Sequence, residues 1–359
     1  MAKAILLLSG GLDSGLAGKI LLSCGIEVTA VNATSPFCRC SGHGGGCAAA
    51  ARMAAQLGIP LTTVAKGEAY WEIVKNPRFG RGSGVNPCID CRIHVLSLAR
   101  EIMEASGALF VATGEVLGQR PMSQHRRALS RIERESGLTG RLLRPLSARL
   151  FPPTEAERQG IVPRWKLLAI EGRSRRPQME LARELALGDY PCPAGGCLLT
   201  DPQFSCRVRE MLAREPDSRL ADAVLLIHGR HFRLPDGERV VIGRNEKDNR
   251  AIAGLARPGD ALLVPAEGSG PTGLCRPGTE AAVRAAAGLV AGYGKSVTRL
   301  SLTRPGESLS RTLADFSPLA PEQAEPWRIA CKEDPHRTEA KRLPSSPPPG
   351  GPGGDDPPR

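Results

Sequence analysis

Residues 4–25 read AILLLSGGLDSGLAGKILLSCG, an apolar run that ends abruptly in a glycine turn. The run AILLL contains no polar residue, which is typical of a strand buried on both faces of a parallel sheet. From Leu16 to Leu22 the apolar residues recur at helical spacing. A strand, a glycine-rich turn and a helix bring several backbone N–H groups to one point, which suits an anion. The stretch therefore predicts a phosphate site at the end of a first strand.

The following residues repeat this alternation of strands and helices. Strand signals recur at residues 27–33, 60–65 and 108–114, and helix signals at residues 47–58 and 93–107. Such an order indicates an α/β fold, a parallel sheet with helices on both faces. Because ligands bind at the carboxyl ends of parallel strands, residues 9–14, 34–47 and 113–120 should line one mouth.

The rest of the chain changes character several times. Residues 123–135 predict a basic helix, and alternating apolar residues around the turn at Pro235 and Gly237 predict hairpins of a small α+β module. Proline and glycine dominate the last residues, which predicts a disordered tail. The expected units are an α/β domain (1–150), a helical extension with a cysteine loop (151–206), the α+β module (207–300), a C-terminal extension (301–332) and the tail (333–359).

The composition of the chain favours a nucleic-acid-binding protein over a membrane protein. The net charge is +11, from 48 basic against 37 acidic residues, which favours a polyanionic partner such as nucleic acid. No run of 18 apolar residues exists, so we expect no membrane span. The short apolar run at the N-terminus is followed directly by turn residues, unlike a signal peptide, and we expect a cytoplasmic protein.

Eleven cysteines are many for a reducing compartment. Several are closely spaced: Cys38 with Cys40, Cys88 with Cys91, and Cys192 with Cys197. In a cytosolic protein this spacing favours metal or sulfur chemistry over disulfides. The remaining cysteines are expected to be packing residues; they are Cys24, Cys206, Cys275 and Cys331.

The glycine turn resembles the pyrophosphate loop of the ATP-pyrophosphatase (PP-loop) family. The matching residues are Ser9, Gly10, Gly11, Leu12, Asp13 and Ser14. Members of this family adenylate an oxygen atom and then replace it with nitrogen or sulfur. The resemblance implies that ATP binds these residues and that pyrophosphate leaves into the loop, with Asp13 supporting Mg²⁺ or pyrophosphate.

Two further segments resemble tRNA thiolation enzymes, so the resemblance covers roughly residues 1–200. FVATGEVLGQRPMSQ resembles a segment of the 4-thiouridine synthetases, with matches at Gly114, Glu115, Gly118, Gln119 and Gln124. NPCIDC resembles the cysteine segment of the tRNA 2-thiouridylases and places Cys91 on the catalytic cysteine; PAGGCLLTD places Cys197 on the second cysteine. The resemblance implies catalytic roles for Asp13, Cys91 and Cys197, and an ATP contact for Gly114.

The pair Cys88 and Cys91 departs from the persulfide-type thiouridylases, which lack the first of these cysteines. A related subgroup holds a 4Fe–4S cluster on a CxxC pair and one distant cysteine. This resemblance implies a cluster on Cys88, Cys91 and Cys197, with Cys192 as the rival third ligand. A structural zinc half-site or a redox-active pair without metal stays open.

A second group of cysteine and histidine residues, which are common metal ligands, follows the second predicted strand. Cys38, Cys40, His43 and Cys47 form either another metal site or thiols on an active-site loop, and the sequence does not separate these readings.

The C-terminal module resembles the RNA-binding module of the fibronectin-binding-like ribosome quality-control proteins. The matching residues are Gly243, Arg244, Asn245 and Asn249. The two asparagines either contribute to binding or set the hairpin geometry. The candidate RNA contacts are Arg120, Arg126, Arg127, Arg230, Arg244, Lys247 and Arg250.

The hypothesis from sequence is an ATP-dependent tRNA sulfurtransferase. It adenylates a uridine or another base, delivers sulfur from its cysteines and releases pyrophosphate and AMP. The sulfur donor is sulfide or a persulfide carrier. Two alternatives stay open: a non-catalytic, nucleotide-sensing RNA-binding factor, and a PP-loop sulfurtransferase that acts on a substrate other than RNA. The sequence does not reveal the modified base or whether the protein is a homodimer.

Overall fold

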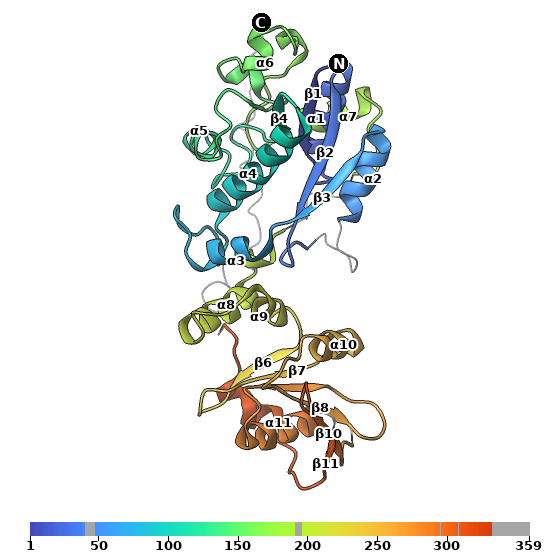
Figure 1. Cartoon of the computed structure of the whole chain (residues 1–359), viewed down its shortest axis with the longest axis vertical. Coiled ribbons are helices and arrows are strands. Elements are labelled where there is room, and N and C mark those ends of the chain that lie inside the picture. The colour runs from blue at the N-terminus through green and yellow to red at the C-terminus, as the bar shows by residue number, and fades with distance from the viewer. Residues whose placement is uncertain (40–46, 191–195, 295, 308, 332–359) are drawn as a thin grey trace, which may run out of the picture.

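The structure is a computed structural model that describes residues 1–39, 47–190, 196–294, 296–307 and 309–331. Figure 1 shows a parallel-sheet domain in the upper half and an antiparallel-sheet module in the lower half, with helices α8 and α9 between them. The borders of the five expected units stay predictions.

The first sheet contains five parallel strands in the order β3-β2-β1-β4-β5. The strands are β1 (Lys3–Leu7), β2 (Glu27–Thr34), β3 (Leu61–Ala65), β4 (Phe110–Thr113) and β5 (Leu142–Leu143). The four strands predicted from sequence are confirmed. The fifth was missed because two residues carry no periodic signal.

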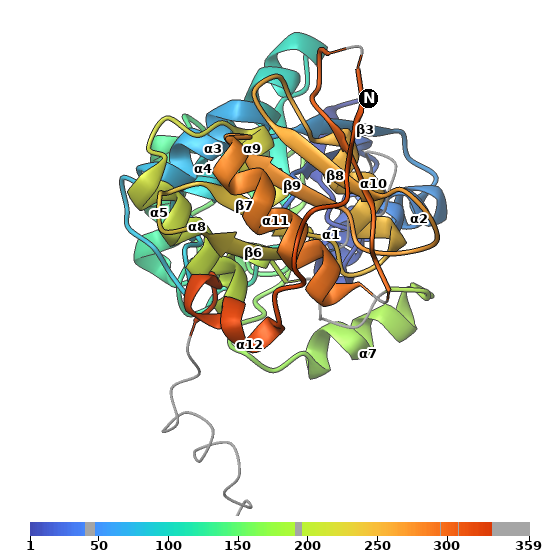
Figure 2. The same cartoon turned by 90° about the horizontal axis from the view of Figure 1, so that it is seen from below.

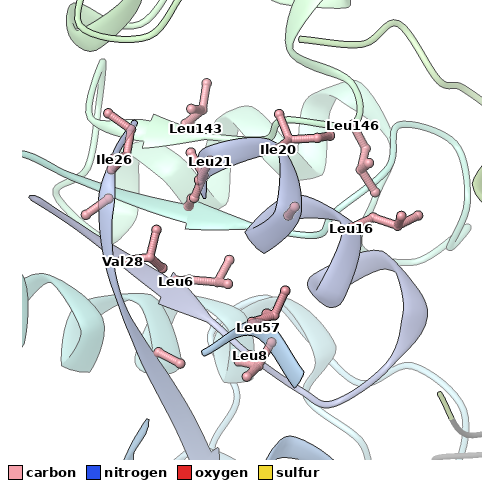
Figure 3. Close-up of a cluster of buried hydrophobic side chains, with 14 of the residues drawn as sticks. Leu6, Leu8, Leu16, Ile20, Leu21, Ile26, Val28, Leu57, Leu143 and Leu146 are labelled. Atoms are coloured by element: carbon pink, nitrogen blue, oxygen red, sulfur yellow. The ribbon is translucent and has the colours of Figure 1, made fainter. Parts of the chain in front are cut away.

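Helices cover both faces of this sheet, as predicted. They are α1 (Leu12–Ser23), α2 (Ala48–Leu57) and α7 (Arg176–Glu184) on one face, and α4 (Cys88–Ser106) and α5 (Arg126–Glu135) on the other. Side chains of β1 alternate between the two cores: Leu6 packs with Leu16 and Leu57 (Figure 3), whereas Ile5 packs towards α4. Burial on both faces explains why β1 is apolar throughout.

The strand order creates a crevice at one edge. The chain runs outward from β1 to β2 and β3, then returns to place β4 on the other side of β1. At such a switch point the loops after β1 and β4 diverge, and the carboxyl edge is left open for a ligand. The candidate site lies at this edge.

A connecting layer joins the two sheets. Helix α3 (Gly67–Lys75), which the sequence analysis did not predict, packs against α8 (Pro202–Arg214) and α9 (Leu220–Leu225) through one apolar cluster. In that cluster Tyr70 and Trp71 are buried, and the Trp71 Nε1–H donates to the Ser218 carbonyl at 2.8 Å.

The second sheet is antiparallel, with the order β11-β10-β8-β9-β7-β6. Its strands are β6 (Arg230–Arg233), β7 (Arg239–Ile242), β8 (Ala261–Pro265), β9 (Gly273–Arg276), β10 (Leu300–Thr303) and β11 (Arg311–Leu313). Helix α11 (Glu280–Tyr293) covers one face, as Figure 2 shows from below, and α10 (Glu246–Gly254) packs on the other. The predicted hairpin at Gly237 joins β6 and β7, which confirms the α+β class of this module.

Short elements complete the described chain. They are the helices α6 (Glu155–Arg158) and α12 (Pro321–Ala324) and the 3₁₀ turns η1 (Ala148–Leu150), η2 (Arg164–Lys166), η3 (Leu198–Thr200) and η4 (Glu325–Trp327). Within the described ranges, no helix combines the length and the hydrophobicity that a bilayer crossing requires.

One expectation about cysteines is wrong. Cys206 and Cys331, assigned to packing, form a disulfide that ties the end of the described chain to α8, with Cα atoms 5.7 Å apart. Sequence alone does not reveal this pair, because 125 residues separate its members. Cys275 is fully buried in the core of the second sheet, as expected of a packing residue.

Candidate active site

The predicted phosphate loop lies between β1 and α1. Gly11 is the N-cap residue of α1, and because it has no side chain it cannot accept hydrogen bonds from the first amides of the helix. The first amides of the helix are therefore left for a ligand, at the positive end of the helix dipole. Leu12 is buried in the core, so it contributes only its backbone to such a site.

Glycine is required at two points of this loop region. Gly10 has φ +78°, and a Cβ there would lie 2.4 Å from the backbone of Ala49 in α2. A Cβ on Gly114, which follows β4, would lie 2.4 Å from the backbone of Asp13. Close packing of three backbone segments explains both glycines and brings the loop after β4 against the phosphate loop.

The two serines order the turn from within. The Ser14 hydroxyl donates to the Gly11 carbonyl at 2.9 Å, and the Ser9 and Ser14 hydroxyl oxygens are 3.2 Å apart. Cys47, buried at the start of α2, places its sulfur 3.9 Å from the Ser9 carbonyl oxygen.

Asp13 carries an incompletely paired carboxylate. Its Oδ2 accepts a hydrogen bond from Gln119 Nε2 at 3.1 Å and lies 3.7 Å from Arg175 Nη2. Its Oδ1 is buried, and in the described residues it has no hydrogen-bond partner. Burial raises the pKa of Asp13, against the opposing effects of Arg175, Gln119 and Arg120. A buried, unpaired carboxylate oxygen beside an anion site fits Mg²⁺, which proteins commonly bind through one or two carboxylates and substrate phosphates.

Cys91 lies in the first turn of α4 with two polar groups at its sulfur. Lys66 Nζ donates to Cys91 Sγ at 3.3 Å, and the Tyr70 hydroxyl is hydrogen-bonded to the same sulfur. The Lys66 ammonium also lies 4.7 Å from the centre of the Tyr70 ring. His94 Nε2 lies 3.0 Å from the Lys66 carbonyl oxygen and so donates to it, which anchors the backbone at Lys66.

The ionisation of these groups is coupled. Burial acts to lower the pKa of Lys66, but the sulfur atoms of Cys91, Cys38 and Cys197 outweigh burial and raise it. Burial, with Cys91 next, raises the pKa of Tyr70. Lys66 therefore stays a cation beside the sulfur, and Tyr70 stays a neutral donor. The Lys66 ammonium therefore places a positive charge beside the Cys91 sulfur.

Sequence reasoning missed Lys66 and Tyr70. Both belong to the β3–α3 junction, 25 and 21 residues before Cys91, and only folding brings them to its sulfur. The one available signal was helical spacing of apolar residues in EAYWEIVK, which would have predicted α3 and a buried Tyr70.

Cys197 and Cys38 complete the group of sulfur atoms. Cys38 follows β2, and Cys197 precedes η3; the two residues form an isolated antiparallel bridge. Burial raises the pKa of Cys197 to about 11, and its neighbours Cys91 and Cys38 add to the rise. The predicted catalytic pair, Cys91 and Cys197, is thus packed together against the same apolar cluster.

The predicted cluster ligands are not assembled in the described residues. Cys88 lies beside Gly82, and its pKa is raised by burial and by Cys91 and opposed by Arg120. In the described ranges no three side chains of cysteine, histidine, aspartate or glutamate form a group that could hold a metal ion. The assignment of Cys88, Cys91 and Cys197 to a cluster therefore stays a prediction. The other candidates, Cys40, His43 and Cys192, lie outside the described residues.

Arg120 links the two halves of the site. It lies close enough to both Asp13 and Cys88 to oppose the burial-driven rise in the pKa of each group. Arg120 follows β4, and its charge acts both on the phosphate loop and on the start of α4. These two parts of the site therefore lie near the same side chain. This is the juxtaposition that the shared strand edge predicts.

A buried charge network fixes the residue after Cys91. Arg92 pairs with Glu115 at 2.8 Å, and Glu115 also accepts from Arg144 Nε at 3.2 Å. Arg144 in turn contacts Glu133 of α5 at 2.8 Å. Despite burial, the two arginines hold the pKa of Glu115 below its ordinary value. Through its ion pair with Arg92, Glu115 thus helps to fix the position of α4.

The other matched residues of the same loop shape its backbone. Gly118 has φ +77°, and its N–H donates to the Gln124 carbonyl at 2.7 Å. Gln124 is itself buried, and its N–H donates to the Arg120 carbonyl at 2.9 Å. These contacts hold Arg120 and Gln119 in a compact turn beside Asp13.

The predicted RNA contacts differ in availability. Arg126 donates to the Leu150 carbonyl at 3.0 Å and lies over the Phe151 ring, yet it is exposed, as are Arg127 of the same helix and Arg120. Arg230 lies over the Tyr293 ring. Arg120, Arg126 and Arg127 are therefore accessible, whereas Arg230 is half-buried.

The module motif around α10 is largely structural. Asn245 caps α10 by accepting from the Asp248 N–H at 2.9 Å, and Asn249 bonds the Gly270 carbonyl and the Thr272 N–H at 3.0 and 2.9 Å. These contacts support the reading in which the asparagines set local geometry. Arg244 and Arg250 form ion pairs with acidic residues one turn away, while Lys247 is exposed.

An unpredicted hollow of about 540 Å³ lies between the β6–β7 hairpin and the end of α8. Four arginines line it: Arg214, Arg233, Arg257 and Arg276. Arg233, Arg257 and Arg276 are paired with acidic residues, whereas Arg214 is exposed. Glu215 and Asp260 also line the hollow, so its charge is mixed.

Two family models match separate parts of the chain. Residues 2–135 match the model described as the tRNA methyl transferase HUP domain, and the first domain has this HUP, PP-loop-like fold. Residues 229–328 match the model described as the NFACT protein RNA binding domain. A search of curated protein sequences found no match.

Solved structures resemble the chain over parts of its length. One is a 4-thiouridine synthetase–RNA complex with bound ATP (23% identity, 62% of this chain and 52% of that chain, TM-score 0.33). Another is the U34-tRNA thiolase NcsA from Methanococcus maripaludis with its 4Fe–4S cluster (16% identity, 63% of this chain and 73% of that chain, TM-score 0.30). A third is the C-terminal part of the fibronectin/fibrinogen-binding protein from Streptococcus suis (15% identity, 35% of this chain and 60% of that chain, TM-score 0.25). The chain therefore spans between half and two thirds of the synthetase and streptococcal chains.

Proposed function

We propose that this protein is an ATP-dependent tRNA sulfurtransferase whose sulfur-carrying residue is Cys91. The observation that carries the proposal is the sulfur of Cys91, held 3.3 Å from the Lys66 ammonium and packed beside Cys197. This group lies at the carboxyl edge of the sheet that also bears the loop of residues 9–14. Adenylation followed by sulfur transfer requires a phosphate-binding loop and a reactive sulfur close together, and both lie at this edge of the sheet.

The first step activates the base. The base oxygen attacks the α-phosphorus of ATP, the bond to the β-phosphate oxygen breaks, and pyrophosphate leaves. Amides at the start of α1 face the leaving group, where the helix dipole stabilises negative charge. Asp13 Oδ1 would hold Mg²⁺, which neutralises charge on the phosphates. Gln119 and Arg175 keep the other oxygen of Asp13 in place.

The second step transfers sulfur. A carrier loads Cys91 as a persulfide, whose terminal sulfur attacks the adenylated carbon and displaces AMP. The Cys197 thiol then gives up its proton to the departing base sulfur and attacks Cys91 Sγ; the sulfur–sulfur bond breaks, and the thiolated base leaves. Cys91 and Cys197 end as a disulfide. Lys66 and Tyr70 hold the Cys91 sulfur through hydrogen bonds during both exchanges.

The persulfide route is preferred to the cluster because of the contacts of Cys91. Its sulfur faces an ammonium and a hydroxyl, two hydrogen-bond donors that would hold a persulfide. Absorbance of anaerobically purified protein tests this choice. We expect no broad brown band; a band lost in Cys88→Ala and Cys91→Ala would support the cluster instead.

RNA is the preferred substrate because basic surfaces occur on both parts of the molecule. Exposed Arg127 on α5 and Lys247 on α10 are available for phosphates, and the C-terminal module matches an RNA-binding description. The family description of the first domain names methyl transfer. The pairing of Cys91 with Cys197 favours sulfur, since methyl transfer to RNA has no evident use for two adjacent thiols.

The test is a reconstituted reaction with tRNA, ATP and a persulfide donor. Pyrophosphate release and thiolated nucleosides are measured together by mass spectrometry and a coupled assay. A nucleotide-sensing factor would bind ATP without RNA-dependent pyrophosphate release. A sulfurtransferase for another substrate would thiolate no tRNA, yet would still consume ATP when supplied with that substrate.

A further inference from the structure

Cys38 and Cys197 lie directly opposite each other on two antiparallel segments. The Leu198 N–H donates to the Phe37 carbonyl at 2.8 Å, and the Arg39 N–H donates to the Gly196 carbonyl at 3.3 Å. These two bonds flank the pair, which makes it a non-hydrogen-bonded pair of an antiparallel ladder. The Cα atoms of such pairs are about 4.5 Å apart, with their side chains on the same face.

This arrangement matches the geometry of a disulfide. Disulfides join residues whose Cα atoms are about 4.4–6.8 Å apart, so the pair needs no backbone movement to form one. An ion pair between Arg39 and Asp201, at 2.9 Å, fixes the same two segments just beyond the bridge. The segments therefore hold Cys38 and Cys197 in a register that is compatible with a disulfide.

Both cysteines also face the catalytic sulfur. Cys38, Cys197 and Cys91 all act on the one Lys66 ammonium, and Cys38 and Cys91 are both neighbours of Cys197. The Ser35 hydroxyl oxygen lies 3.4 Å from Cys38 Sγ on the side of β2. Cys197 thus has both other cysteines as electrostatic neighbours, and Cys38 lies opposite it in the bridge.

We propose that Cys38 is a resolving thiol that returns Cys91 to its reduced form. The inference rests on the proposed function for the Cys91–Cys197 disulfide with which it begins. The Cys38 thiol loses its proton to solvent and attacks Cys197 Sγ. The Cys91–Cys197 bond breaks, its electron pair stays on Cys91, and a Cys38–Cys197 disulfide forms. An external dithiol later reduces that disulfide.

The exchange gives the enzyme a specific advantage. Cys91 leaves as a thiolate beside the Lys66 ammonium, ready to accept the next sulfur. The disulfide then joins Cys38 and Cys197 and no longer includes Cys91, which is the residue that accepts sulfur. The other described cysteines near the site have different surroundings: Cys47 contacts the Ser9 carbonyl, and Cys88 lies beside Gly82.

The first experiment does not depend on thiolation activity. Full-length Cys91→Ser and wild-type proteins are equilibrated in glutathione redox buffers, alkylated and mapped by non-reducing peptide mass spectrometry. We expect Cys91→Ser to form the Cys38–Cys197 disulfide. Its absence from Cys91→Ser, under conditions that oxidise Cys197 in the wild type, would overturn the proposal.

The second experiment follows one turnover with tRNA, ATP and persulfide donor but without reductant. We expect the wild type and the control Cys24→Ser to end with Cys38–Cys197, and Cys38→Ser to end with Cys91–Cys197. A wild type that retains only Cys91–Cys197 would overturn the resolving role. If the wild type makes no thiolated tRNA, the proposed function fails, and the first experiment still decides whether the pair exists.

Discussion

The ammonium of Lys66 lies 3.3 Å from the sulfur of Cys91, although the two residues come from different strand–helix connections. Lys66 follows β3, and Cys91 lies in the first turn of α4. The contact gives Cys91 a charged hydrogen-bond donor in a half-buried position. It distinguishes Cys91 from Cys88, its partner in the CxxC pair, and it leads to the first prediction.

Replacing Lys66 by Met should slow both alkylation of Cys91 and tRNA thiolation. A hydrogen bond to a charged group contributes about 1.5–3 kcal/mol, which corresponds to a roughly 10- to 100-fold loss of rate. Lys66→Arg should retain much of the activity, because it keeps the charge. Lys3→Met, on the opposite edge of the sheet, is the matched control. Equal alkylation rates in Lys66→Met and the control would contradict the role of Lys66.

Cys197 should react slowly with alkylating reagents at neutral pH. Burial, reinforced by Cys91 and Cys38, raises its pKa to about 11, so the thiol form predominates below that value. Because the thiolate is the reactive form, the alkylation rate should rise about tenfold per pH unit up to that range. Peptide mass spectrometry across pH 7–11 measures this. A rate that levels off near pH 8 would be inconsistent with the environment seen here.

Glu115→Gln should destabilise the first domain. The substitution leaves Arg92 and Arg144 without their shared carboxylate in a buried site, which costs about 3–5 kcal/mol. Urea denaturation of the two proteins measures the difference. Glu104→Gln, a surface change on α4, should shift the midpoint little.

The same carboxylate should contribute to acid sensitivity. The folded protein lowers the pKa of Glu115, so its stabilisation is present above the unfolded value near 4.5 and is lost as pH falls through the folded value. The stability difference between wild type and Glu115→Gln should therefore shrink in acid. A difference that stays constant from neutral pH to below the folded pKa would argue against the ion pairs as its cause.

Lys247→Glu should weaken tRNA binding in a salt-dependent manner. Loss of one phosphate contact reduces the slope of log K against log salt by about 0.7–0.9. Arg250→Gln is the comparison, because Arg250 is paired with Glu246 within α10. Fluorescence anisotropy with labelled tRNA at several salt concentrations measures both. Identical slopes for wild type and Lys247→Glu would remove Lys247 from the interface.

The fold could be predicted from sequence further than the site could. Apolar runs alternate with helical periodicity from β1 to β4, and these local signals decide the parallel sheet and the phosphate loop. Strand β5 has only two residues, and α3 carries its signal on Tyr70, Trp71 and Val74 alone. Both elements depend on burial supplied by distant parts of the chain.

The surroundings of Cys91 show why sites are harder to predict than folds. The resemblance of NPCIDC and PAGGCLLTD to segments of thiolation enzymes predicts roles for Cys91 and Cys197. Lys66, Tyr70 and Cys38 have no such spacing and reach the sulfur only through tertiary packing. Conversely, the motif at Asn249 suggested RNA contacts, but its amide bonds the protein backbone on both sides.

The most direct test of the central claim measures pyrophosphate and thiolated nucleoside in one reaction with tRNA, ATP and persulfide donor. We expect Cys91→Ala to release pyrophosphate but make no thiolated nucleoside, because adenylation precedes sulfur transfer. We expect Asp13→Asn to lose both products by about 10²–10³-fold, as expected when leaving-group stabilisation is removed. Undiminished thiolation by Cys91→Ala, with Cys24→Ala as the control, would contradict the account.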